Sequence, residues 1–317
     1  MQEEKPKVSI IVLTYNRFDE IKRNIESIIR QQYDSYEVII SDDGSPNLDK
    51  PYLESLFLSD KTGRFSIISR EKNIGTVRNY NRAIEQAKGD IIVPLSQDDY
   101  FYSDHALTQI EEAFKDTETN VCLGLRIVEN KQTILPNVYQ QGIIREGDKK
   151  KTWFRNACKN MLYGAALYYR RDYLLNAGIF DESYDLLEDY PFIMKAIENS
   201  ERITVLNEPT VVCGSNGVSS GSYKGASKRL VNDQIRLRKT LYESSTGIIK
   251  SHICKRYLDY LLCRWQNAHK SFCIQRLQYP IISLIVLFTK IMALIKKEDV
   301  MDCRFKLLWR IETKASR

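Results

Sequence analysis

The chain has 317 residues, of which 43% are hydrophobic and 28% are charged, values typical of a globular protein with a substantial core. Seven scattered cysteines without a CxxC pair, and only three histidines, argue against a zinc or disulfide framework and favour a reducing cytoplasm. The net charge of +6 is uneven, because residues 221–317 hold 20 Lys and Arg against 7 Asp and Glu, whereas residues 1–220 hold 27 against 34. The acidic start and the lack of a long apolar run argue against a signal peptide and a classical membrane span.

The first 120 residues alternate strand and helix patterns. Runs rich in β-branched residues predict strands at 7–13, 36–41, 64–69 and 90–96. Helical spacing of apolar residues, with turn signals between the segments, predicts helices at 19–32, 48–60, 75–89 and 103–116. This alternation predicts an α/β fold with a Rossmann-like, mostly parallel sheet flanked by helices.

The patterns after residue 120 are less regular. Residues 121–129 and 164–171 are typical of strands, and residues 186–200 of a helix with carboxylates in its first turn. From about residue 221 the sequence is helical and basic to the end. We therefore expect a domain over residues 1–220 and a basic helical C-terminal extension over residues 221–317.

Three polar clusters follow predicted strands: "TYN" at 14–16, "DDGS" at 42–45 and "SQDD" at 96–99. Ligands bind beyond the carboxyl ends of parallel strands, so the three clusters are expected to meet at one edge of the sheet. The adjacent carboxylates Asp98 and Asp99 suit Mg²⁺ or Mn²⁺. Successive strand residues point in opposite directions, so a turn must begin there, or one carboxylate must serve another ligand such as a ribose hydroxyl. A solvated acidic pair before a helix is the alternative.

Four further side chains are candidates for binding a nucleotide. Tyr15 offers a ring for stacking, Asn16 a polar edge, and Asp43 a carboxylate that accepts hydrogen bonds from a base. Arg78 falls in the first turn of a predicted helix, where its charge suits a phosphate. Each also has a plainer interpretation, as a turn, a strand end or a solvated helix residue. The sequence contains neither GxxxxGK[ST] nor GxGxxG, which disfavours P-loop hydrolysis and dinucleotide redox chemistry.

Five blocks between about residues 6 and 220 carry a family resemblance. In order they are "VSIIVLTYNR", "YEVIISDDGS", "NIGTVRNYNRAIEQAKGDIIVPLSQDD", "GAALYYRRDYLLNAGIFDE" and "LEDYPFIMKAI". Together they resemble the family 2 glycosyltransferases of GT-A fold. The resemblance implies an enzyme that transfers a sugar, with inversion, from a nucleoside diphosphate donor with the help of Mg²⁺ or Mn²⁺. It also implies a nucleotide-binding half at residues 1–120 and an acceptor-binding half at residues 121–220.

The resemblance assigns roles to the nucleotide-binding candidates. It implies that Tyr15 stacks on the base with Asn16 beside it, that Asp43 hydrogen-bonds the base, and that Arg78 lies near the phosphates.

The family resemblance also assigns roles to three acidic residues. Asp98 would contact ribose or metal, Asp99 would ligate the metal, and Asp189, second in "LEDY", would be the catalytic base. Three features depart from the pattern: Ser96 stands where many relatives carry Asp, Val77 stands for Ala in the ARN block, and the Gly/Ser-rich loop 214–225 lacks their histidine. That loop is rich in Gly and Ser, so it is either a lid that orders over the donor or a plain linker.

The basic tail contains an apolar stretch at 279–295, interrupted by Lys290 and preceded by basic and aromatic residues. This composition is typical of interfacial helices and favours an anionic membrane surface. The alternatives are a helical subdomain packed on the catalytic body, or on a second copy in a homo-oligomer. Nucleic acid is disfavoured, since no known module pattern occurs.

We therefore expect a cytoplasmic glycosyltransferase, peripheral on the inner face of the cell membrane, that extends a lipid-linked glycan acceptor in capsule or O-antigen synthesis. A non-catalytic nucleotide-sugar-binding partner subunit is the alternative. A nucleotidyltransferase would require a glycine-rich basic loop after the first strand, which "TYNRFDE" does not provide.

Overall fold

The computed structural model describes residues 6–16, 18–214, 227–267 and 278–316. The chain forms two compact units, one made of residues 1–137 and 162–220 and the other of residues 138–161 and 221–317. Within the described residues, no helix is long and apolar enough to cross a membrane.

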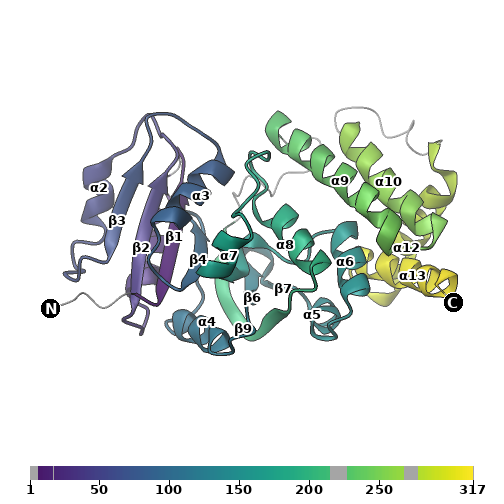
Figure 1. Ribbon diagram of the computed structural model, residues 1–317, viewed down its shortest axis with the longest axis horizontal. Helices are drawn as coiled ribbons and strands as arrows, with labels where there is room; N and C mark the ends of the chain where they lie inside the picture. Colours follow the sequence, from purple (N-terminus) through teal and green to yellow (C-terminus); the bar gives the residue numbers. More distant parts are fainter. Residues whose placement is uncertain (1–5, 17, 215–226, 268–277, 317) are drawn as a thin grey trace. The chain divides into compact units, whose positions relative to one another are not determined.

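The first unit contains a sheet of nine described strands (Figure 1). Four parallel strands lie in the order β3-β2-β1-β4: β1 (Val8–Thr14), β2 (Tyr36–Asp42), β3 (Phe65–Ser69) and β4 (Ile91–Ser96). The sheet continues through β8 (Leu167–Arg170), β6 (Val121–Val128), β9 (Ile203–Cys213) and β5 (Tyr100–Phe101), and β7 (Thr133–Leu135) pairs with β6. Because β8 is antiparallel to both β4 and β6, the sheet is parallel in its first half and mixed in its second. The predicted α/β class is confirmed.

Helices cover both faces of the parallel strands. α1 (Ile21–Ile29) buries Ile21, Ile25 and Ile28 against Val8, Ile10 and Val12 of β1, in a core shared with α2 (Lys50–Ser55) and α4 (Ala106–Phe114). α3 (Thr76–Gln86) packs on β1 and β2 and buries Val77, Tyr80 and Ile84. The β-branched strands are therefore buried on both sides, which is why they are apolar without alternation.

The remaining elements of the first unit surround the second half of the sheet. They are η1 (Glu129–Lys131), η2 (Gly164–Ala166), α7 (Arg171–Asn176) and α8 (Asp189–Glu198).

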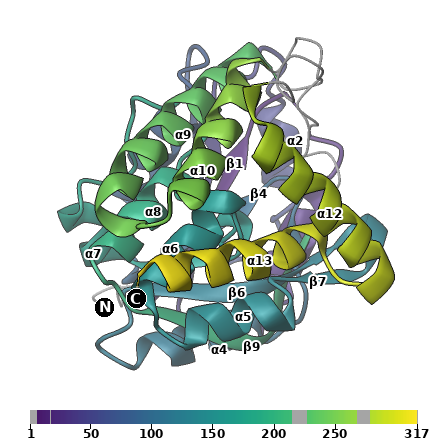
Figure 2. The same cartoon turned by 90° about the vertical axis from the view of Figure 1, so that its right-hand side faces the viewer.

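The second unit is helical (Figure 2). Its described helices are α5 (Val138–Arg145), α6 (Lys149–Cys158), α9 (Lys228–Ile248), α10 (His252–Gln266), α12 (Pro280–Lys296) and α13 (Val300–Ala315). A buried ion pair joins α6 to α13, with Arg155 Nη2 2.8 Å from Asp302 Oδ1, and Gln140 Nε2 donates to both Asp302 oxygens at 3.2 Å. Buried Glu312 of α13 accepts the backbone N–H groups of Lys250 and Ser251, each at 2.8 Å.

Residues 138–161 pack with the C-terminal helices, whereas the sequence pattern places them in the acceptor-binding half of residues 1–220. Their partners are remote in sequence, since Asp302 lies 147 residues beyond Arg155. The division of binding roles between the segments stays a prediction.

Candidate active site

The three predicted polar clusters meet at one edge of the sheet. In the ladders, Thr14 of β1 lies opposite Asp42 of β2, and Leu13 lies opposite Ser96 of β4, so the strands end together. The backbone continues this pairing beyond the strands, because the Asp43 N–H donates to the Thr14 carbonyl at 3.0 Å. The carboxyl ends of parallel strands are the place where α/β sheets bind ligands.

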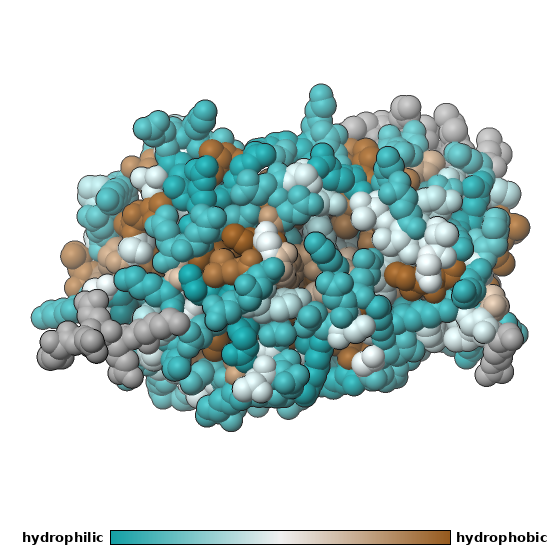
Figure 3. All heavy atoms as spheres, viewed as in Figure 1, coloured by the Kyte–Doolittle hydropathy of each residue, from teal (hydrophilic) through white to brown (hydrophobic). Residues whose placement is uncertain are grey.

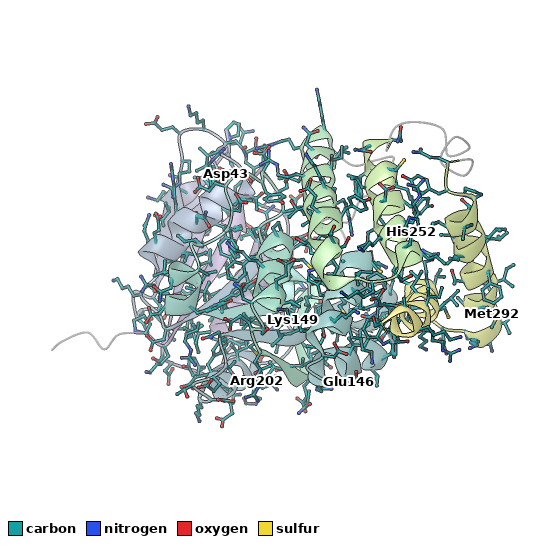
Figure 4. All side chains as sticks on the ribbon, turned by 45° about the vertical axis from the view of Figure 1, so that its right-hand side comes forward. Asp43, Glu146, Lys149, Arg202, His252 and Met292 are labelled. Carbon is teal, nitrogen blue, oxygen red and sulfur yellow. The ribbon has the colours of Figure 1, made fainter. Side chains whose placement is uncertain are left out.

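Asp43 is buried at this edge and fixes the start of α3 (Figure 4). Its Oδ1 accepts the N–H of Ile74 at 2.8 Å, and its Oδ2 accepts the N–H of Gly75 at 3.0 Å. Gly75 caps the helix with φ +97°, a conformation that favours glycine. The contact of Asp43 with a nucleobase stays a prediction.

The loop after β1 presents Tyr15 to solvent. Its side chain is 43% exposed. The next residue, Asn16, has φ +57°, and its N–H donates to Ser45 Oγ at 2.8 Å. Ser45 is itself held by buried Asp42, which accepts both its N–H and its hydroxyl. These contacts fix the loop and leave the Tyr15 ring exposed, and its stacking on a base stays a prediction.

Arg78 lies in the first turn of α3 and is half-exposed. Its Nε lies 3.5 Å from Glu182 Oε2, and its guanidinium donates to the carbonyls of Ile74 and Glu182. Exposed ion pairs of this kind contribute only about 0–1 kcal/mol, so an anionic ligand can compete with Glu182 for Arg78.

Asp98 and Asp99 follow β4 in a turn, which the Asp99 N–H closes by donating to the Ser96 carbonyl at 2.9 Å. Asp99 Oδ1 accepts the N–H of Gly214 at 3.1 Å. A Cβ placed on Gly214 would lie 2.6 Å from the Asp98 carbonyl oxygen and 3.2 Å from Asp98 Oδ2. Both carboxylates therefore lie near Gly214. They can lie on the same side because β4 has ended and the alternation of side chains along a strand no longer applies.

The electrostatics of this pair suit a cation. Burial and the charge of Asp98 raise the pKa of Asp99 to about 7, although the Gly214 N–H and the charge of Arg126 work in the opposite direction. No group of three or more His, Cys, Asp or Glu forms a cage for an ion among the described residues. Mg²⁺ is commonly held by one or two carboxylates and completed by substrate phosphates. The pair fits a divalent ion of that kind.

Asp189 is the first residue of α8 and is partly buried. Its Oδ2 accepts the N–H of Gly164 at 2.7 Å, and a Cβ on Gly164 would lie only 2.9 Å from that oxygen. Burial raises the pKa of Asp189. The backbone N–H groups of Gly164 and Tyr190 and the charge of Arg126 work to lower it, but burial outweighs them. A fixed carboxylate with a raised pKa is suited to accept a proton.

Arg126, on β6, is a candidate site residue that the sequence reasoning missed. Its guanidinium stacks 3.6 Å from the ring centroid of Tyr163. Its charge works to lower the pKa of both Asp99 and Asp189, so it lies within electrostatic reach of the acidic pair and of the predicted base. A single charge in the otherwise apolar strand "VCLGLRIV" was the available signal.

The predicted lid over residues 214–225 lies, except for Gly214, outside the described residues.

The sequence matches the family described as "Glycosyl transferase family 2" over residues 9–175. The chain therefore belongs to glycosyl transferase family 2, a family of enzymes. It is 30% identical over 199 residues to an uncharacterized glycosyltransferase of Haemophilus influenzae, and the match spans 60% of each protein. It is 27% identical to the uncharacterized glycosyltransferase EpsJ of Bacillus subtilis, over 82% of this chain and 76% of EpsJ.

A shorter match relates it to the putative teichuronic acid biosynthesis glycosyltransferase TuaG of Bacillus subtilis. That match is 32% identical over 35% of this chain and 43% of TuaG.

Solved structures share the fold. S. aureus TarS 1-349 in complex with UDP-GlcNAc superposes with a TM-score of 0.58 at 21% identity, covering 84% of this chain and 73% of TarS 1-349. The mannosyltransferase PcManGT from Pyrobaculum calidifontis, in complex with GDP-Man and Mn²⁺, gives a TM-score of 0.54 at 16% identity, covering 97% and 88%. The predicted GT-A-type fold is confirmed by this likeness.

Proposed function

We propose that the protein is an inverting glycosyltransferase that moves a sugar from a nucleoside diphosphate donor to a hydroxyl of a glycan acceptor. The observation that carries the proposal is a pair of acidic sites held by backbone N–H groups. Asp99 Oδ1, beside Asp98 at the sheet edge, accepts the Gly214 N–H at 3.1 Å, and Asp189 Oδ2 at the start of α8 accepts the Gly164 N–H at 2.7 Å.

Different residues of the candidate site would carry out different parts of sugar transfer. Asp99, with Asp98, would hold the divalent ion, which when bound neutralises charge on the diphosphate. Arg78 can add a cationic contact to the phosphates once it leaves Glu182, and Tyr15 can stack on the base. Inversion is a single displacement at the anomeric carbon, so it needs one base, and Asp189 takes the proton from the attacking hydroxyl. Its Oδ2 is oriented by the Gly164 N–H.

The relatives support the substrate classes. TarS and PcManGT are described with UDP-GlcNAc and GDP-Man, which supports a nucleoside diphosphate sugar as donor. TuaG is described as a putative teichuronic acid biosynthesis glycosyltransferase, which supports a role in the synthesis of a bacterial surface polysaccharide, such as a capsule or O-antigen. A lipid-linked acceptor is our proposal for that setting. The alternative is a non-catalytic donor-binding subunit. The oriented Asp189 carboxylate favours the enzyme.

A thermal-shift screen tests donor and metal together. Nucleoside diphosphate sugars are added with and without Mn²⁺ to the wild type and to Asp99→Asn. We expect at least one donor to raise the melting temperature in a Mn²⁺-dependent manner, since a ligand that binds only the folded state stabilises it. Asp99→Asn should lose the Mn²⁺-dependent part, whereas the exposed control Asp172→Asn should keep it.

Two outcomes would count against the proposal. One is a screen in which no donor stabilises the wild type. The other is an Asp99→Asn variant that keeps the full Mn²⁺-dependent shift. Release of nucleoside diphosphate on incubation with the selected donor separates the enzyme from a binding subunit.

A further inference from the structure

Helix α12 of the second unit presents large hydrophobic side chains to solvent. Six of them are 49–80% exposed: Leu284, Leu287, Phe288, Ile291, Leu294 and Ile295. At about 100° per residue they fall within roughly 120° of the helix circumference, so they form one face. We call this the outer face of α12. Hydrophobic atoms reach the surface at the right-hand edge of Figure 3, where Figure 1 places α12 and α13.

The opposite side of α12 is fixed to its own unit. Ile282, Thr289 and Ala293 are buried on that side. Arg304 of α13 donates from Nε to Thr289 Oγ1 at 3.2 Å, and the Tyr279 hydroxyl donates to Asp259 of α10 at 3.0 Å. A helix held in this way cannot roll to hide its outer face. Contiguous exposed apolar patches of this kind mark sites of protein–protein or membrane interaction.

Cations accompany the outer face. Lys290 lies one turn before Leu294, and Lys296 and Lys297 end the helix; all three lysines are exposed. Lysines at the margin of an apolar face are typical of helices that lie in a membrane interface, where their ammonium groups reach the lipid headgroups. Figure 4 marks this helix by Met292.

The charge of the second unit favours lipid over a second copy. Residues 221–317 carry a net charge of +13. Three of their seven carboxylates, Asp233, Asp302 and Glu312, and two of their twenty cations, Arg238 and Arg304, are buried, so burial leaves the segment strongly basic. Two copies meeting through α12 would bring two such basic segments together, whereas an anionic bilayer attracts them.

We propose that the outer face of α12 docks the protein onto an anionic phospholipid surface, with the helix lying in the interface. The proposed contact lies along the surface of the bilayer, and no helix among residues 6–16, 18–214, 227–267 and 278–316 is long and apolar enough to cross it. This inference goes beyond sugar transfer, and its test does not depend on activity.

Vesicle co-sedimentation of the full chain tests the docking. The vesicles are phosphatidylcholine alone, or phosphatidylcholine with phosphatidylglycerol. The test variant is Leu287→Glu/Leu294→Glu, which places two negative charges on the outer face. The control Leu58→Glu/Val138→Glu adds the same charge at hydrophobic side chains that are 74% and 85% exposed elsewhere. Truncation at residue 221 is unsuitable, since it would remove the partners of α5 and α6.

We expect the wild type and the control to bind anionic vesicles more tightly than neutral ones, and less tightly as salt is raised. The test variant should bind roughly ten-fold more weakly or worse, because it loses apolar contact and adds repulsion. Its melting temperature should match that of the control. Sedimentation equal to the wild type would overturn the proposal. So would a wild-type oligomer that the test variant converts to monomers without loss of vesicle binding, because a second copy would then cover the face.

Discussion

Replacing Asp189 by asparagine tests the assignment of the base. The substitution keeps the size of the side chain and removes its ability to accept a proton. The amide oxygen of asparagine can still accept the Gly164 N–H that now lies 2.7 Å from Asp189 Oδ2, so the start of α8 should keep its conformation. The substitution should therefore lower the rate of sugar transfer and leave the stability of the fold nearly unchanged.

The expected loss of rate follows from the role of Asp189 as general base. General base catalysis typically contributes 10²- to 10⁴-fold to the rate, so kcat should fall by about that factor, which corresponds to about 3–5 kcal/mol of barrier. Donor affinity should change little, because the groups assigned to the nucleotide and the metal lie at the ends of β1, β2 and β4 and in the first turn of α3.

The assay uses the donor selected by thermal shift. Release of nucleoside diphosphate, with water or the acceptor as the attacking group, reports turnover, and calorimetry reports the donor Kd. The control is Asp172→Asn, an exposed aspartate of α7. An Asp189→Asn enzyme with wild-type turnover would refute the reasoning, and so would one whose activity fell only because donor binding was lost.

Two further predictions concern metal binding and stability. In Gly214→Ala the new Cβ would lie 2.6 Å from the Asp98 carbonyl oxygen, so the turn that holds Asp98 and Asp99 must shift. Mn²⁺-dependent stabilisation by the donor should therefore fall. The control Gly247→Ala, which has open space around its new Cβ, should retain that stabilisation. Burial works to raise the pKa of Glu312, but hydrogen bonds from Lys150 and from the backbone of Lys250 and Ser251 outweigh it and hold that pKa below its usual value. Glu312→Gln should cost about 2 kcal/mol near neutral pH in urea unfolding, since it disturbs buried partners. Because the folded-state pKa is depressed, this stabilisation is present above about pH 4.5 and is lost as the pH falls through the folded pKa. A difference from the wild type that stays constant from neutral to acidic pH would contradict this account.

The local pattern of apolar residues was sufficient to predict the strands and helices of the first half of the sheet. Its strands are apolar runs and its helices have regular spacing, so the polar clusters could be placed at strand ends before any coordinates were known. The mixed half depends on pairings between distant strands, such as β8 between β4 and β6, and local periodicity carries no information about these.

Non-local contacts also explain what was missed at the site. Gly164 and Gly214 orient Asp189 and Asp99 through backbone N–H groups, which leave no signature in the identity of a side chain. Arg126 was missed because its role depends on acidic groups brought close by folding. The helix 149–158 begins with three lysines, yet Arg155 and Asn156 further along it are buried.

The ion pair between Arg155 and Asp302 has a consequence for the order of synthesis. Helix α6 is translated long before its counter-charge, which follows 147 residues later. A buried guanidinium without its carboxylate is strongly unfavourable, so a nascent chain must leave α5 and α6 undocked until α13 leaves the ribosome. Residues 138–161, in the middle of the growing polypeptide, should therefore stay open to chaperone binding or proteolysis for as long as the C-terminal helices of their unit are incomplete.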